Sequence, residues 1–271
     1  GNIDLPGRSA INNNVAEWDM IDFNPEDWAD EFIRILKPSG NLFIFTSYNQ
    51  LGRWYNSLDH KFDTSNFMIW HKTNPVPKIF KAGFLNSCEI IFVCWNKKHT
   101  WNFISQKEMH NFIESPICMR PERLKTPKHP AQKPLSILKK MIKIASNEDD
   151  IVFDPFMGVG STGVAALELN RRFIGIELDE VYCEAARRRI NETFAELHKK
   201  EQMKPSTKYS ICEENNNNSV VSENEVAYQP SLFELEEFFQ IPNICIFDKT
   251  ESRYTTGLKP IIKWAGGKEK E

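Results

Sequence analysis

The sequence of 271 residues contains no apolar run of the roughly 18 residues that a membrane-spanning helix needs. Six cysteines are present, but no two form a C-x-x-C pair, and their spacing is not typical of a zinc site or a disulfide framework. They stand at Cys88, Cys94, Cys118, Cys183, Cys212 and Cys245. We therefore expect no membrane span and no metal, and we predict a reducing, cytoplasmic location.

The formal net charge is only −3, yet the charges are unevenly distributed. Residues 97–143 contain eleven Lys or Arg against three Glu, a local charge of +8. Residues 201–251 contain ten acidic residues against three Lys, a local charge of −7. The basic middle segment favours a nucleic-acid partner, whereas the overall net charge by itself says nothing about nucleic acid.

Apolar periodicity predicts an α/β protein. A helix is expected to begin at Asn24-Pro25-Glu26-Asp27, because an N-cap residue, a proline and acidic residues favour a first turn. The other expected elements are strands at 41–46, 67–71 and 89–95, a helix at 133–146, a strand at 151–153, a helix at 162–169, a strand at 172–178 and a helix at 179–198. The alternation after residue 150 is typical of half a doubly wound sheet.

The polar stretch over 201–256, which includes four consecutive asparagines, is expected to be a largely disordered linker. Within it, residues 231–247 regain aromatic side chains at helical spacing.

A glycine-rich turn carries the densest chemical signal. Gly158, Gly160 and Gly163 fit G-x-G-x-x-G after a strand, and Glu177 follows 19 residues after the first glycine. Glycines let backbone N–H groups approach a ligand, and a carboxylate can accept hydrogen bonds from a ribose diol. An adenosine-containing cofactor is therefore predicted. A P-loop is excluded because no lysine lies in the turn.

Two cofactor classes fit this turn, a nicotinamide dinucleotide and S-adenosylmethionine. Asp154 and Phe156 stand between the strand and the first glycine. A carboxylate there would repel a pyrophosphate but would attract the ammonium and sulfonium charges of S-adenosylmethionine. In a purely structural interpretation Phe156 belongs to the core and Asp154 caps the turn.

Three blocks resemble the β-class amino-group DNA methyltransferases: KHPAQKPLSILKKMI, then DPFMGVGSTG, then RRFIGIELDEVYCEAARRRI. Their order is the permuted order of that class, and similarity over about residues 1–200 extends to Leu36–Gly40 and Trp70–Pro77. The resemblance implies a Rossmann-like methyltransferase fold that binds S-adenosylmethionine. By position it places around the cofactor Asp154, Phe156, Gly158, Gly160, Ser161, Thr162, Glu177, His129, Gln132, Lys133 and Pro134.

The catalytic phrase of that family, Asp/Ser/Asn-Pro-Pro-Tyr/Phe, occurs nowhere in the sequence. Gly1-Asn2-Ile3-Asp4 resembles the residues that follow it, so we expect the phrase to lie before Gly1 and assign no catalytic residue. Asn74-Pro75-Val76-Pro77 is not a substitute, because valine cannot stack on a flipped base.

The family keeps its target-recognition segment where residues 97–128 stand here. Basic side chains alternate there with the aromatic residues His99, Trp101 and Phe103. We expect DNA contacts from Arg120, Arg123, Lys125 and Lys128. A solvated basic surface is the alternative for any one of them.

Residues 257–271 contain KPIIKWAGGK, which resembles the opening of the α-class DNA adenine methyltransferases. We therefore expect a second methyltransferase module to begin there.

The resemblance implies a site-specific DNA methyltransferase of a restriction-modification or phage self-protection system. Glu17-Trp18-Asp19 resembles the adenine-N6 members of the family more than the cytosine-N4 members, so adenine N6 is the expected acceptor and cytosine N4 the alternative. An NAD-dependent oxidoreductase and a non-catalytic nucleic-acid-binding fragment are alternatives of other classes.

Overall fold

The computed structural model describes residues 24–77 and 83–202, together with short strands at 2–3, 11–12, 244–247 and 252–254. The chain divides into two compact units, residues 1–115 and 116–271. Three of the segments discussed above lie outside the described residues. They are the expected second module at 257–271, the Glu17-Trp18-Asp19 segment and most of the expected linker.

The first unit contains a four-stranded sheet of order β3-β5-β4-β6. Its strands are β3 (Asn41–Thr46), β4 (Thr64–Lys72), β5 (Cys88–Trp95) and β6 (Phe112–Ser115). Both β3 and β4 run antiparallel to β5, and β6 runs parallel to β4. The strand predicted at 89–95 is confirmed as β5, and its residues Ile91, Phe92, Val93 and Cys94 are all buried.

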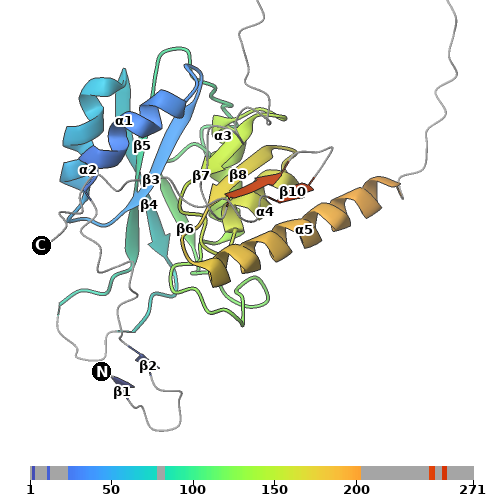
Figure 1. Cartoon of the computed structure of the whole chain (residues 1–271). Helices are drawn as coiled ribbons and strands as arrows, with labels where there is room; N and C mark the ends of the chain where they lie inside the picture. Colours follow the sequence, from blue (N-terminus) through green and yellow to red (C-terminus); the bar gives the residue numbers. More distant parts are fainter. Residues whose placement is uncertain are drawn as a thin grey trace, which may run out of the picture. The chain divides into compact units, whose positions relative to one another are not determined.

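Two helices pack on this sheet, α1 (Glu26–Ile35) and α2 (Leu51–Leu58), the latter followed by the 3-10 turn η2 (Asp59–Lys61) (Figure 1). Their apolar side chains and one face of the sheet form a core of Ala29, Phe32, Trp54, Leu58, Phe62, Phe92 and Cys94. α1 begins as predicted, with Glu26 and Asp27 in its first turn, where acidic groups favour the helix dipole. Two short strands, β1 (Asn2–Ile3) and β2 (Ile11–Asn12), pair antiparallel.

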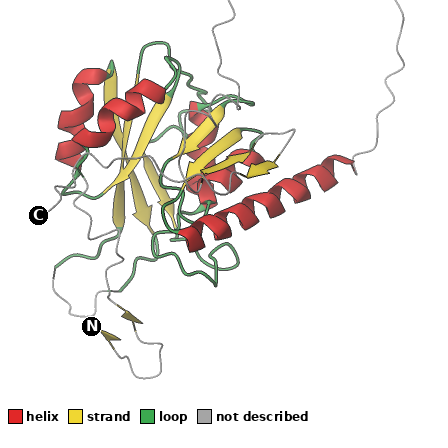
Figure 2. Ribbon diagram, in the orientation of Figure 1, coloured by secondary structure: helices red, strands yellow, loops and turns green. Residues whose placement is uncertain are grey.

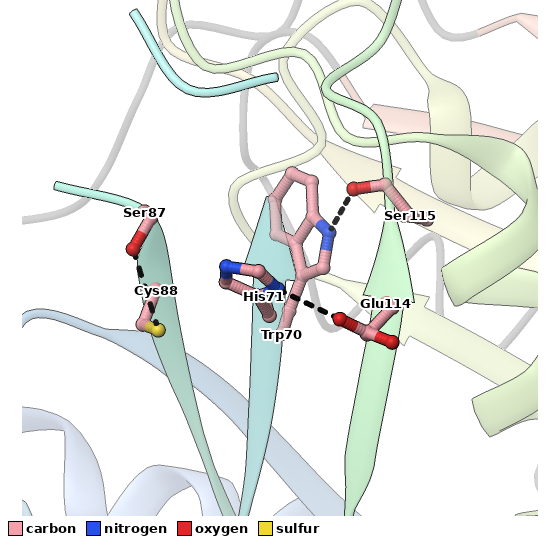
Figure 3. A network of polar contacts seen from close by, with 6 residues as sticks. All are labelled: Trp70, His71, Ser87, Cys88, Glu114 and Ser115. Atoms are coloured by element: carbon pink, nitrogen blue, oxygen red, sulfur yellow. Dashed lines mark hydrogen bonds and ion pairs between the residues drawn. The ribbon is translucent and has the colours of Figure 1, made fainter. Parts of the chain in front are cut away.

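Polar contacts lie at the neighbouring ends of β4, β5 and β6 (Figure 3). The indole N–H of Trp70 donates to the carbonyl of Ser115 (3.3 Å), and Nδ1 of His71 lies 3.0 Å from a carboxylate oxygen of Glu114. Just before β5, the hydroxyl of Ser87 lies 3.8 Å from the thiol of Cys88, the first residue of the strand. The contacts of Trp70 and His71 fix the short strand β6 against the carboxyl end of β4.

The second unit contains α3 (Leu135–Ala145), β7 (Ile151–Asp154), α4 (Ser161–Glu168), β8 (Arg172–Ile176) and α5 (Glu180–Gln202). The parallel pair β7 and β8 belongs to a sheet of order β10-β9-β8-β7, completed by β9 (Ile244–Phe247) and β10 (Ser252–Tyr254). β9 pairs antiparallel with β8. Residues 244–247, which end the stretch with aromatic side chains at helical spacing, are thus a strand paired with the edge of β8.

A buried arginine joins two helix ends in this unit. The guanidinium of Arg171 donates to the carbonyls of Leu169 and Ser146 and to the hydroxyl of Ser146, which lie at the ends of α4 and α3. Helix ends leave carbonyls without partners inside the helix, and Arg171 supplies donors for them.

The α/β class predicted from the sequence is confirmed, because each unit combines a sheet with helices (Figure 2). The described strands pair in two sheets of four strands and one of two, β1 with β2. Among the described residues, no helix is both long and apolar enough to cross a membrane.

Candidate cofactor site

The candidate site is built where β7 and β8 end side by side. The two strands are parallel, with Asp154 opposite Gly175, so Asp154 and the residues after Ile176 meet at one edge of the sheet. The turn after β7 is tied to β8, because the N–H of Met157 donates to the carbonyl of Ile176 (3.0 Å). This edge is where α/β proteins bind ligands.

Glu177 holds the glycine turn directly. Its carboxylate accepts hydrogen bonds from the backbone N–H groups of Gly158 (2.8 Å) and Asp179 (2.9 Å). Burial raises the pKa of Glu177, although these bonds act in the opposite direction. Each carboxylate oxygen has a second lone pair, so Glu177 can still accept a hydrogen bond from a hydroxyl group of a ligand.

Asp154 lies at the base of the same turn. It accepts hydrogen bonds from the hydroxyl of Thr162 (2.6 Å) and the backbone N–H of Phe156 (3.0 Å). Burial raises the pKa of Asp154, with both bonds opposing. The capping interpretation therefore holds for Asp154. Phe156 does not belong to the core, since 53% of its surface is exposed.

Two of the three glycines are required by the backbone. Gly158 has φ +52° and Gly160 has φ +77°, conformations that strain residues with a Cβ. A Cβ on Gly158 would lie 3.0 Å from Nε2 of His129, and one on Gly160 would lie 2.9 Å from Cβ of Ala186. Gly163 has ordinary helical geometry, but a Cβ there would clash with Ile190 and Phe173.

His129 packs over the glycine turn. Its ring lies against Gly158 and meets the ring of Tyr182 edge-on at 4.7 Å between centroids. The N–H of Ala131 donates to Nδ1 (3.3 Å), which places the proton of the neutral ring on Nε2, toward the turn. Burial, followed by the positive charges of Lys133 and Arg123, lowers the pKa of His129.

The other residues of the predicted H-P-x-Q-K-P block support the loop that carries His129. The buried amide of Gln132 donates to the carbonyl of Glu122 (3.0 Å) and accepts from the N–H of Leu124 (3.1 Å). Pro134 is buried at the N-cap of α3, and Lys133 is half-buried. Ser161 is also buried, and its hydroxyl accepts from Arg189 (3.2 Å).

The family model of the DNA methylases named N6_N4_Mtase matches residues 8–188. The chain belongs to this family. The type II methyltransferase M.HinfI of Haemophilus influenzae is 34% identical over 196 residues, which are 65% of this chain and 55% of M.HinfI. The type II methyltransferase M2.DpnII of Streptococcus pneumoniae is 32% identical over 216 residues, which are 71% of this chain and 79% of M2.DpnII.

A crystal structure of M1.HpyAVI in complex with SAM superposes with a TM-score of 0.54 at 34% identity, covering 61% of this chain and 81% of that one. A second structure of M1.HpyAVI gives a TM-score of 0.51 at 31% identity, over 61% of this chain and 80% of that chain. The chain spans about half the length of M.HinfI, the first of these curated relatives.

The predicted DNA-binding residues lie in the loop before α3. Arg120, Lys125 and Lys128 are exposed. Arg123 is half-buried, and its guanidinium lies 3.5 Å from the carbonyl of His129, so it also supports the His129 loop.

The aromatic part of the expected recognition segment lies elsewhere in the first unit. Trp95, His99 and Trp101 form a cluster with ring centroids 5.4 to 5.5 Å apart. Trp95 pairs with the first residues of β3 and β4, so the cluster lies at the amino ends of these strands. It also lies at the carboxyl end of β5, because Trp95 is the last residue of that strand and β5 runs antiparallel to β3 and β4. The expected contact of this segment with DNA stays a prediction.

Three residues at the site were missed by sequence reasoning, namely Tyr182, Arg189 and Glu122. Glu122 accepts from the N–H of Leu135 (2.7 Å), the first residue of α3. Only the position of Tyr182, five residues after the predicted ribose acid Glu177 and in the first turn of α5, gave any signal. No cluster of His, Cys, Asp and Glu able to hold a metal occurs in the part of the chain that the structure describes.

Proposed function

We propose that this chain binds S-adenosylmethionine and belongs to an enzyme that transfers its methyl group to an exocyclic amine of a DNA base. The observation that carries the proposal is the pair of carboxylates, Asp154 and Glu177, at the ends of neighbouring strands around one glycine turn. Family membership and the SAM complex of M1.HpyAVI support it.

Charge separates this cofactor from a nicotinamide dinucleotide. Burial raises the pKa of both Asp154 and Glu177, which means that the unliganded site disfavours their negative charges. A ligand with a sulfonium and an ammonium group relieves this cost, whereas a pyrophosphate increases it. In addition, the N–H of Gly158 already donates to Glu177 and is not free for a phosphate.

Within this proposal, Asp154, Phe156, Gly158, Gly160, Ser161 and Thr162 surround the methionine part, and Glu177 binds the ribose. His129, held over Gly158 with its proton on Nε2, closes the pocket. Gln132, Lys133 and Pro134 act by holding the loop that presents His129.

The substrate is proposed to be DNA, with adenine N6 as the acceptor and cytosine N4 as the alternative. Exposed basic residues of the loop before α3, Arg120, Lys125 and Lys128, would contact phosphates. Type II relatives support a role in restriction and modification. The four cysteines that the structure describes are free, which supports a reducing cytoplasm.

Methyl transfer tests the proposal. The protein translated from the full coding sequence is incubated with DNA and isotopically labelled S-adenosylmethionine, and digested DNA is examined by mass spectrometry. N6-methyladenine is the expected product, and N4-methylcytosine would select the alternative. Binding of DNA without transfer to any sequence would favour a non-catalytic binder. The same coding sequence shows whether a second module follows residue 257.

A further inference from the structure

Arg189 of α5 reaches the glycine turn from the side of the helix. Its Nη1 donates to the carbonyl of Val159 (2.6 Å) and lies 3.2 Å from the hydroxyl of Ser161. Val159 and Ser161 stand on either side of Gly160, whose φ of +77° forms the bend into α4. One guanidinium therefore binds both sides of the bend.

The surrounding helix face leaves the turn little freedom. Ala186, Arg189 and Ile190 are three and four residues apart and so lie on one face of α5. A Cβ on Gly160 would approach Ala186 to 2.9 Å, and a Cβ on Gly163 would approach Ile190 to 2.5 Å. The glycine turn thus packs directly on α5, with Arg189 as its polar contact.

Keeping Arg189 charged at this position costs desolvation free energy. Its two hydrogen-bond acceptors are a carbonyl and a hydroxyl oxygen rather than a carboxylate. Burial lowers the pKa of Arg189, while Cys118, Glu122 and Glu192 act in the opposite direction. Arginine nevertheless keeps its proton in proteins, so a charge stands behind the turn.

The hydrogen bond also orients a peptide group. The C=O and N–H groups of a trans peptide point in opposite directions, so fixing the Val159 carbonyl on Arg189 fixes the N–H of Gly160 as well. That N–H donates to the carbonyl of Met157 (2.8 Å) and closes the turn. The N–H groups that begin α4 follow directly and have no acceptor within the helix.

We propose that Arg189 is a positioning residue for the methionine end of the cofactor: by binding Val159 and Ser161 it sets the glycine turn so that the first N–H groups of α4 face the ligand's carboxylate. This inference rests on the proposed function. Arg189 does not touch the ligand in this account. It acts through the turn, on the amino-acid part of the ligand, and leaves the adenosine part to Glu177.

Two ligands separate this role from a general structural one. S-adenosylhomocysteine has the amino-acid part, whereas 5′-methylthioadenosine has the adenosine part and a thioether but no carboxylate or ammonium. Titration calorimetry with this chain compares Arg189→Met, Arg189→Lys and a control, Arg188→Met, which alters an exposed residue of the same helix. Circular dichroism verifies that each variant is folded.

Arg189→Met is expected to lower the affinity for S-adenosylhomocysteine at least about tenfold, the loss typical of one charge-assisted hydrogen bond. The affinity for 5′-methylthioadenosine should fall less than about twofold. Arg189→Lys should recover part of the loss, and Arg188→Met should change neither ligand. Equal losses for both ligands, or no loss, would overturn the inference.

If Arg189→Met does not fold, Arg189→Lys decides alone: a loss confined to S-adenosylhomocysteine supports the inference, and unchanged or equally reduced affinities overturn it. An unmodified chain that binds neither ligand would instead overturn the proposed function, and this inference with it.

Discussion

Glu177 and Gly158 are joined by a hydrogen bond of 2.8 Å from the backbone N–H to the carboxylate. The acid follows β8 and the glycine follows β7, so this contact makes the two predicted cofactor elements a single structure. The glycine turn is thus shaped before a ligand arrives, and pre-organised groups lose less entropy on binding.

Gly158→Ala tests this shape. Alanine at φ +52° costs about 1–2 kcal/mol, and its Cβ would press on His129. We expect a loss of at least this size in the free energy of unfolding, measured by denaturant titration, together with loss of S-adenosylhomocysteine binding. Gly52→Ala is the matched control, because a Cβ there meets nothing within 4 Å inside helix α2. It should stabilise by about 0.5–1 kcal/mol. Equal effects of the two substitutions would contradict the account.

The pH dependence of binding follows from the two carboxylates. Because burial raises their pKa values, Asp154 and Glu177 hold protons in the folded chain at pH values where the unfolded chain has lost them. Their contribution to stability is therefore full below the ordinary pKa values of 3.8 and 4.5, and is lost as the pH rises through the raised values. A cationic ligand binds best once both are ionised.

Affinity for S-adenosylmethionine should consequently rise as the pH increases above this range, and more steeply than affinity for S-adenosylhomocysteine, which lacks the sulfonium charge. His129 acts in the same direction, because its pKa is lowered and it gains a competing positive charge only in acid. Calorimetry at several pH values measures both ligands. Asp154→Asn should reduce the difference between their pH profiles. Parallel profiles in the unmodified chain would refute the assigned charge interaction.

Local sequence patterns were sufficient to predict the order β7, turn, α4, β8, α5, since glycines, apolar runs and the acidic residue after β8 are signals within a few residues. The family resemblance placed Asp154 and Glu177 around one cofactor, and the parallel pairing of β7 and β8 brings the ends of these strands to a common edge. α2 and β6 were missed. β6 has only four residues and is held by contacts such as His71 with Glu114, which no local pattern contains.

Long-range partners explain the remaining differences. The roles of Gln132 and Arg189 depend on backbone groups 8 to 30 residues away, which composition does not reveal. The aromatic cluster of Trp95, His99 and Trp101 begins at the last residue of β5, and the antiparallel direction of that strand places Trp95 at the amino ends of β3 and β4. The DNA contact expected of the 97–128 segment stays a prediction.

Arg171 offers a stability test independent of the cofactor. Replacement by methionine removes the guanidinium donors from the carbonyls of Ser146 and Leu169 at the ends of α3 and α4. We expect a loss of about 2–4 kcal/mol in the free energy of unfolding. Arg172→Met, which removes an exposed bond to the carbonyl of Asp149, should cost less than about 1 kcal/mol. A similar loss in the two variants would show that Arg171 is not the link between the helix ends.

DNA binding should distinguish the two basic regions. Replacing Arg120, Lys125 and Lys128 together by alanine should weaken binding and reduce the slope of log K against log salt by up to about 3, near 0.9 for each lost phosphate contact. The double variant Lys97→Ala, Lys98→Ala serves as control, because these residues follow β5 at the amino ends of β3 and β4. Fluorescence anisotropy over a salt series measures both. A larger effect of the control variant would contradict this assignment and would indicate that DNA binds near the aromatic cluster instead.

The central claim is that the two carboxylates and the glycine turn bind S-adenosylmethionine rather than a dinucleotide. Calorimetric titration of this chain with S-adenosylhomocysteine and with NAD, repeated on Glu177→Ala, tests it most directly. We predict binding of S-adenosylhomocysteine alone, weakened at least about tenfold in the variant because a hydrogen bond to a charged group contributes about 1.5–3 kcal/mol. Binding of NAD without binding of S-adenosylhomocysteine would contradict the account.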